Sequence, residues 1–174
     1  MPPEIQTTIQ RAKDQPSSFE AQVAAGDLYY RIKRFDEAVV YFTRANKIRP
    51  DNYDVLVKLG NVSFDADDFP AAEKWYTAAL AMKPNDVNVR TDLGLTFVFR
   101  KPENFDRAVT EFRRSLEVNP KHEQTLQNLT FALAQKKDTT GALAVLKRLE
   151  EVNPSNTAIS GLRAQIDGVS TATQ

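Results

Sequence analysis

The chain has 174 residues, 41% of them hydrophobic, and its 23 Lys and Arg residues balance 23 Asp and Glu residues. Without a net positive field the protein is a poor partner for nucleic acid, and the lack of cysteine excludes disulfides, thiolate chemistry and cysteine-ligated metals. No apolar run approaches the roughly 18 residues of a membrane span, and no secretory signal follows Met1. We expect a chain that is soluble as given, in the cytoplasm or the periplasm, with one continuous core and no direct membrane insertion. An export signal or anchor removed ahead of Met1 would place it outside the cytoplasm.

The first segment, residues 1–15, carries Ile5, Ile9 and Ala12 at helical spacing. It does not repeat the pattern of the residues that follow. Two interpretations stay open here, a short N-terminal helix and the remnant of a linker.

Regularly spaced prolines mark the periodic part of the chain. They stand 34, 34, 36 and 34 residues apart, at Pro16, Pro50, Pro84, Pro120 and Pro154. Each interval contains two stretches with apolar residues at helical spacing, and a proline ends the second because it cannot continue the helical hydrogen bonds. The spacing therefore predicts four helix-turn-helix repeats, in residues 16–50, 51–84, 85–120 and 121–154.

Small residues recur at two positions of the repeat. Glycine stands ten residues after the first three prolines, at Gly26, Gly60 and Gly94, and alanine stands twelve before the last four, at Ala38, Ala72, Ala108 and Ala142. We expect these residues to let the two helix backbones of a repeat approach closely. The third repeat has two extra residues around 101–103, which predicts a longer turn between its helices.

The segment after Pro154 has the pattern of a terminal cap. Ile159, Leu162 and Ile166 fall on one helical face and polar residues on the other, which predicts a capping helix over 155–167. Gly168 is expected to end this helix, and residues 168–174 to form a flexible tail.

The repeats resemble the tetratricopeptide repeat family, whose pattern places Leu-Gly and an aromatic residue in the first helix and Ala, an aromatic residue and Pro in the second. Leu59 with Gly60 and Ala72 with Tyr76 match this pattern well. The family's early Trp position instead holds Gln22, Leu56, Arg90 and Leu126, and Thr130 replaces glycine in the fourth repeat, where we expect looser packing. The resemblance implies an all-α fold, a right-handed alpha-alpha superhelix of four repeats plus the C-terminal capping helix.

The resemblance also implies that the first helices of successive repeats line a concave groove. Its inward positions predict a peptide-binding site at Asp27, Tyr30, Asp54, Lys58, Asn61, Phe64, Asp65, Asp92, Leu95, Phe99, Gln127, Asn128 and Phe131. Aromatic and aliphatic residues supply apolar anchors, and the acids favour a ligand with some positive charge. The expected partner is therefore a protein or peptide with apolar anchors and some positive charge. Packing of Tyr30, Phe64 and Val98 against neighbouring first helices is the alternative for those three residues.

Catalysis has no evident support in the sequence. The one histidine, His122, follows Pro120 in a turn and is expected to be exposed, with no partner or pocket for a general base. We expect no catalytic residue, no metal and no cofactor, and hence no enzyme.

Family members that grip the acidic C-terminus of a chaperone use a set of Lys, Asn and Arg side chains. The corresponding positions hold Val23, Asp27, Lys58, Asn88 and Asp92, or, one repeat later, Val57, Asn61, Asp92, Gln124 and Asn128. Only Asn61 fits, so a chaperone tail is disfavoured as the ligand.

The sequence thus predicts a non-catalytic interaction scaffold. One alternative is a self-association module, a homodimer formed through the open front edge and the aromatic residues Tyr41 and Trp75. Another is an accessory domain of a larger, membrane-anchored bacterial protein of secretion or cytochrome-assembly type.

Overall fold

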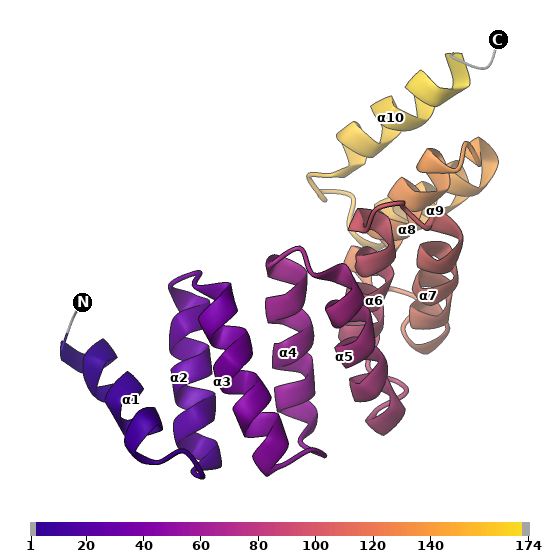
Figure 1. The fold of residues 1–174 in the computed structure, drawn as a ribbon. Coiled ribbons are helices and arrows are strands. Elements are labelled where there is room, and N and C mark those ends of the chain that lie inside the picture. The colour runs from indigo at the N-terminus through magenta and orange to yellow at the C-terminus, as the bar shows by residue number, and fades with distance from the viewer. Residues whose placement is uncertain (1–2, 172–174) are drawn as a thin grey trace. The chain divides into compact units, whose positions relative to one another are not determined.

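The computed structural model describes residues 3–171, which form ten α-helices and no strand (Figure 1). The expected all-α fold class is confirmed. The helices group into two compact units, Met1–Met82 and Lys83–Gln174, and not into the one continuous core expected from chain length. In a repeat protein each repeat contacts only its neighbours, so no centre is shared by all of them.

The first unit contains five helices, which follow one another side by side (Figure 1). They are α1 (Pro3–Asp14), α2 (Phe19–Arg31), α3 (Phe35–Ile48), α4 (Tyr53–Asp65) and α5 (Phe69–Met82). The strongest pairings join α2 to α3 and α4 to α5, as two helix-turn-helix repeats require. One core cluster runs from Ile9 and Ala12 on α1 to Leu59 and Val62 on α4.

Residues 3–14, left open as helix or linker, form the helix α1, which packs on α2. Gln22, at the family's early Trp position, is fully buried and ties the two helices together. Its Nε2 donates to the carbonyl oxygens of Ala12 at 2.7 Å and Gln15 at 3.3 Å. A polar side chain is tolerated at this buried position because it satisfies carbonyl groups at the end of α1.

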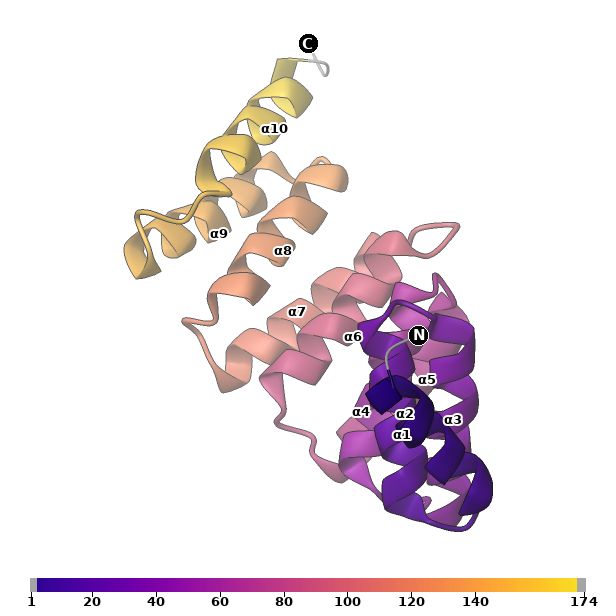
Figure 2. The ribbon, with the colours of Figure 1, turned by 90° about the vertical axis from the view of Figure 1, so that its left-hand side faces the viewer.

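The second unit contains the other five helices, and Figure 2 shows α10 beside α9. They are α6 (Val87–Phe99), α7 (Phe105–Val118), α8 (Glu123–Gln135), α9 (Thr139–Val152) and α10 (Ile159–Thr171). Again the strongest pairings lie within repeats, α6 with α7 and α8 with α9.

The first helix of each repeat begins at the same place relative to its proline. The residue two positions after the proline is the N-cap, and in three repeats its side chain accepts a hydrogen bond from the backbone of the first turn, at Ser18, Asn52 and Asp86. Capping of this kind satisfies amide groups that have no partner inside the helix. Two local signals therefore mark each boundary between repeats: the proline that ends one helix and the N-cap residue that starts the next.

The recurring glycines lie against aromatic rings. A Cβ built on Gly26, Gly60 or Gly94 would fall within 3.0 Å of three ring atoms of Phe42, Tyr76 or Phe112, respectively. The nearest atoms that a side chain would meet belong to an aromatic ring of the second helix, so the glycine makes room for that ring. In the fourth repeat Thr130 stands where the others have glycine, Leu146 stands where they have a ring, and both are buried. The smaller partner leaves space for the threonine.

The turn inside each repeat follows two designs. In three repeats one residue adopts a positive φ, at Lys33, Asp67 and Lys137. The third repeat instead uses the longer connection predicted from its two extra residues, and the turn closes where Asn104 N donates to the Phe97 oxygen at 2.8 Å.

The C-terminal helix differs from its expected bounds. α10 begins at Ile159 and not at 155, because Asn153 and Asn156 first hold Ser155 and Ala158 in a turn. It also runs through Gly168 to Thr171, so the expected stop at Gly168 is wrong. Glycine ends a helix mainly by adopting a positive φ, and no glycine does so among residues 3–171. The rest of the expected tail, 172–174, lies outside the described residues. Within the described part, no helix has the length and apolar character needed to cross a membrane.

Candidate functional site

The predicted groove residues of the first unit lie on α2 and α4; we call this surface its inner face, and side chains from both helices meet there. Asp27 on α2 forms an ion pair with Lys58 on α4. One turn further along, Tyr30 Oη donates to Asp65 Oδ2 at 2.5 Å. Four of the predicted site residues thus form two pairs, and in each pair a residue on α2 bonds to a residue on α4.

The predicted aromatic residues of this face pack within their own repeats. Tyr30 lies against Phe35 with ring centroids 5.9 Å apart, and Phe64 meets Phe69 edge-on at 5.5 Å. Asn61 accepts a hydrogen bond from Tyr76 Oη at 3.0 Å. These ring contacts are made with the second helix of the same repeat, and not with a neighbouring first helix as the alternative for Tyr30 and Phe64 had it.

The acids of the first inner face differ in how open they are to a ligand. A backbone amide at the start of α2, together with the Arg49 guanidinium 2.8 Å away, keeps the pKa of the exposed Glu20 below its ordinary value. Asp54 is exposed and has no ion-pair partner among residues 3–171. Of the predicted acids on this face, Asp54 is therefore the most open to an added cation.

The predicted groove residues of the second unit, which we call its inner face, are more apolar. α6 contributes Asp92, Leu95 and Phe99, and α8 contributes Gln127, Asn128 and Phe131; the two helices are in contact. Phe99 is 52% exposed, the largest exposed fraction among the large hydrophobic residues that the structure describes. Asn128 Nδ2 is buried and has no hydrogen-bond partner in the described part of the chain. Val98, by contrast, is buried in the unit.

Below this face lies a buried cluster of hydroxyl groups that the sequence did not reveal. Thr91 and Ser115 each donate to the Val87 oxygen, at 2.7 and 3.1 Å, and Thr125 Oγ1 lies 2.6 Å from Thr91 Oγ1. The cluster joins α6, α7 and α8. Because its members satisfy one another's hydrogen bonds, it stabilises the packing of these helices.

The histidine belongs to this cluster. His122 is the N-cap residue of α8 and is half-buried, and its Nδ1 lies 2.7 Å from Thr125 Oγ1. The expectation of an exposed turn histidine is wrong in this respect, because the ring folds back over the first turn of the helix. Among residues 3–171 no group of three or more His, Asp or Glu side chains is placed to hold a metal ion.

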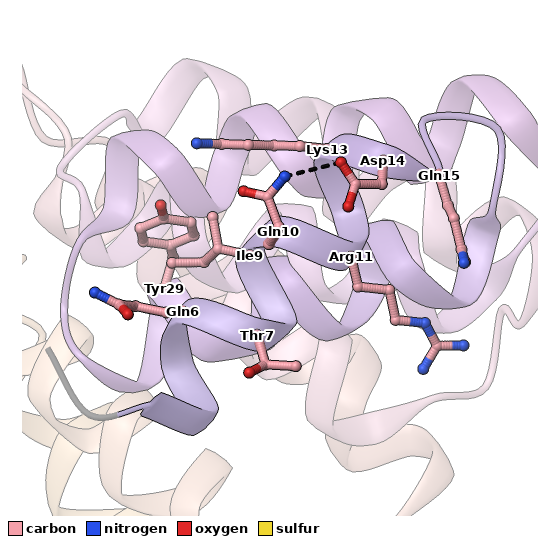
Figure 3. A pocket seen from close by; sticks show the side chains of 9 residues that line it. All are labelled: Gln6, Thr7, Ile9, Gln10, Arg11, Lys13, Asp14, Gln15 and Tyr29. Atoms are coloured by element: carbon pink, nitrogen blue, oxygen red, sulfur yellow. Dashed lines mark hydrogen bonds between the residues drawn. The ribbon is translucent and has the colours of Figure 1, made fainter.

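The front edge of the first unit carries a hollow of about 780 Å³ on α1. Figure 3 shows Ile9 beside Tyr29, with polar side chains such as Gln10 and Lys13 around them. Gln10 Nε2 donates to Asp14 Oδ1 at 2.8 Å. The outward side of α1 is polar, as the terminal element of a repeat array needs to be.

These observations define the class of protein. It is an all-α helical repeat protein whose recurring glycines and rings pack inside each repeat, and whose first helices carry the predicted groove residues. The tetratricopeptide repeat family matches residues 32–93 and 100–166, and a second tetratricopeptide repeat family matches residues 5–53. Together these matches cover most of the chain, which therefore belongs to the tetratricopeptide repeat family.

Solved structures of the same fold are distant in sequence. MamA from Desulfovibrio magneticus RS-1, residues 41 to the end, aligns with a TM-score of 0.79 at 19% identity over 88% of this chain and 85% of that one. YrrB, described as a tetratricopeptide repeat protein with an unusual peptide-binding site, aligns with a TM-score of 0.80 at 21% identity over 92% of this chain and 81% of its own. No curated protein sequence matches this chain. At such low identities the likeness shows the fold alone.

Proposed function

We propose that this protein is a non-catalytic scaffold that binds a peptide or helical segment of a partner protein on the inner face of its repeats. The observation that carries the proposal is Phe99, which is half exposed on the inner face of the second unit beside Leu95. A large aromatic ring left in water costs free energy that a ligand recovers by covering it. Buried aromatic anchors of this kind supply most of the affinity in protein interfaces.

Two further features support a peptide as the ligand. Phe131 lies on the neighbouring helix α8, so a ligand can place apolar side chains against residues of both α6 and α8. Asn128 Nδ2 is buried without a partner among the described residues, and a turn of its side chain toward a ligand would let it donate to a peptide carbonyl. Peptide binding by YrrB, a protein of the same fold, agrees with this use of the architecture.

The side-chain pairs of the first unit weaken the expectation of a positively charged ligand. Asp27 and Asp65 already accept from Lys58 and Tyr30, so they attract a cationic ligand less than isolated acids do. Asp54 keeps that role. We therefore propose a ligand defined first by apolar anchors, with positive charge as a weaker determinant.

The self-association alternative depends on Tyr41, Trp75 and the front edge of the first unit. Tyr41 is only 6% exposed and stacks on Tyr29 with centroids 5.4 Å apart, so it is not an outer aromatic residue. Trp75 is half-buried, and at the front edge α1 packs on α2 and carries the hollow beside Tyr29. Because Tyr41 is buried, we do not propose a homodimer through it.

The test is affinity capture with mass spectrometry, comparing the wild type with a Phe99→Ser, Phe131→Ser double variant. We expect specific partners to be lost while the circular dichroism spectrum keeps its helical form. A matched control is Val40→Ser, an exposed apolar residue on α3, which should retain the same partners. Equal capture by the wild type and the double variant would exclude the inner face of the second unit as the binding surface.

A further inference from the structure

The second unit has another apolar groove, on the side of α8 away from the inner face. It lies over α8 between α7 and α9 and has a volume of about 460 Å³. Its floor is made by Leu116, Leu129, Leu133 and Val145, all of them buried. We call it the α7–α9 groove. None of its lining residues belongs to the inner face that carries the proposed function.

The groove exists because the fourth repeat places small residues where others place large ones. Nine residues before its closing proline, each repeat has one residue of the second helix in the same register: Tyr41, Trp75, Glu111 and Val145. In the first unit Trp75 is half-buried and packs against the core cluster. Val145 is too short to do the same, and Gly141 and Ala144 beside it on α9 add almost no bulk. The space corresponds to a ring that this repeat lacks.

The rim of the groove is basic. Arg113 from α7 and Arg148 from α9 both line it, against one carboxylate, Glu117. Arg148 Nη2 donates to the Pro120 oxygen at 3.0 Å, which holds its guanidinium at the edge, and Arg113 forms no ion pair among residues 3–171. Guanidinium groups stack on aromatic faces and bind carboxylates through paired hydrogen bonds.

The first unit shows how an aromatic ring and a cation combine at this register. Lys74 Nζ lies 4.5 Å from the centroid of the Trp75 ring. The position of Lys74 is taken by Ala144 in the fourth repeat, and the cations there are the two arginines of the rim. A ligand ring in the α7–α9 groove would therefore have both an apolar floor and a cation beside it.

We propose that the α7–α9 groove is a second binding site, which accepts an aromatic side chain, Trp above all, from a partner segment that carries a carboxylate next to it. The ring takes the place that Trp75 fills in the first unit, and the carboxylate meets Arg113 or Arg148. The site is separate from the inner face, so the protein can hold two segments at once.

The experiment follows the methyl resonances of Leu129, Leu133 and Val145 by NMR while the peptide acetyl-Gly-Trp-Asp-Gly-amide is added. Saturable shifts of these methyl groups are expected. The same peptide with Ala in place of Trp should bind at least tenfold more weakly, and the one with Lys in place of Asp several-fold more weakly. Absence of shifts, or equal binding of the Ala peptide, would overturn the proposal.

Variants separate this site from the inner face. Val145→Trp supplies the missing ring from the chain itself, and we expect it to weaken the peptide at least tenfold without lowering the melting temperature. Phe99→Ser, on the inner face, should leave the peptide affinity unchanged, so the two proposals fail independently. If Val145→Trp does not fold, Arg113→Glu with Arg148→Glu tests the rim, and unchanged binding of the acidic peptide would contradict the assigned chemistry. Concentration-dependent association of the wild type, abolished by Val145→Trp in sedimentation, would assign the groove to a second copy of the chain and overturn the proposal.

Discussion

The ring of Phe112 on α7 lies against the α-carbon of Gly94 on α6, so closely that a Cβ on Gly94 would come within 3.0 Å of three ring atoms. Gly94→Ala should therefore destabilise the protein by about 1–3 kcal/mol through overpacking, although alanine is the better helix former. Urea unfolding measures the loss.

The pairing of glycine with a ring makes the effect reversible. Adding Phe112→Leu to Gly94→Ala should recover part of the loss, because the fourth repeat combines buried Thr130 and Leu146 in the same two registers. Gly161→Ala in α10 is the matched control, since its added Cβ would meet no atom within 4 Å. It should stabilise the protein by up to about 1 kcal/mol through helix propensity. Equal losses at Gly94 and Gly161 would refute the steric explanation.

An ion pair in the third repeat predicts strong non-additivity. Arg90 Nη1 lies 2.8 Å from Glu111 Oε2, and the two side chains are only 15% and 11% exposed. Arg90→Leu alone should cost about 2–4 kcal/mol, because it leaves Glu111 largely buried with only the exposed Arg114 as partner.

Replacing both members should be much milder. The fourth repeat has Leu126 and Val145 in these registers, so Arg90→Leu with Glu111→Val should come within about 1 kcal/mol of the wild type. A double-mutant cycle from urea unfolding gives the coupling. If the double variant loses as much unfolding free energy as the two single variants together, the two side chains are not coupled, and the prediction is contradicted.

The turn between α8 and α9 contains a residue that glycine would suit better. Lys137 has a φ of 63°, a conformation that costs a residue with a Cβ roughly 1–2 kcal/mol. Lys137→Gly should raise the stability by about 0.5–1 kcal/mol after the entropy of glycine in the unfolded chain is counted. The control is Lys147→Gly in the middle of α9, which should lower the stability. The melting temperature of each variant provides the measurement, and a lower melting temperature for both would contradict the prediction.

The contact between the start of α8 and the turn that joins α9 to α10 should be sensitive to acid. Glu123 Oε2 accepts hydrogen bonds from Asn153 Nδ2 at 2.8 Å and Asn156 Nδ2 at 3.2 Å, and these two bonds lower the pKa of Glu123 from its ordinary value of 4.5. A lowered folded-state pKa means that the carboxylate contributes stability above the unfolded value and loses it as the pH falls through the folded one.

Glu123→Gln should therefore be less stable than the wild type at pH 7, and the difference should shrink as the pH drops below 4.5. Melting temperatures of both proteins between neutral and acidic pH provide the measurement. A gap that stays constant with pH would mean that the amide bonds do not depend on the charge of Glu123.

Much of the fold was predictable from local features of the chain. A proline ends each second helix, and the residue two positions later caps the next first helix, so Pro50 and Asn52 together mark a boundary that needs no tertiary information. The longer third turn followed from two inserted residues in the same way. Gly168 misled because a glycine ends a helix only where the chain adopts a positive φ, and the residue type alone does not decide this.

The candidate site was less predictable, because its state depends on pairs that lie far apart in the sequence. Asp27 and Lys58 come from different repeats, as do Tyr30 and Asp65, and each member looked like a ligand-binding residue when considered alone. The hydroxyl cluster around Thr91 and Thr125 had no signal at all, since threonines at these positions are compatible with an exposed helix face.

The sequence by itself determined the helical class of the fold and where the helices inside the repeats start and stop, because these depend on backbone chemistry and on the spacing of apolar residues within one repeat. Only the tertiary structure decided which polar and aromatic side chains remain available to a ligand. That availability is set by contacts between helices, where Lys58 neutralises Asp27, Phe69 covers Phe64, and Val145 leaves open the space that Trp75 occupies in the first unit.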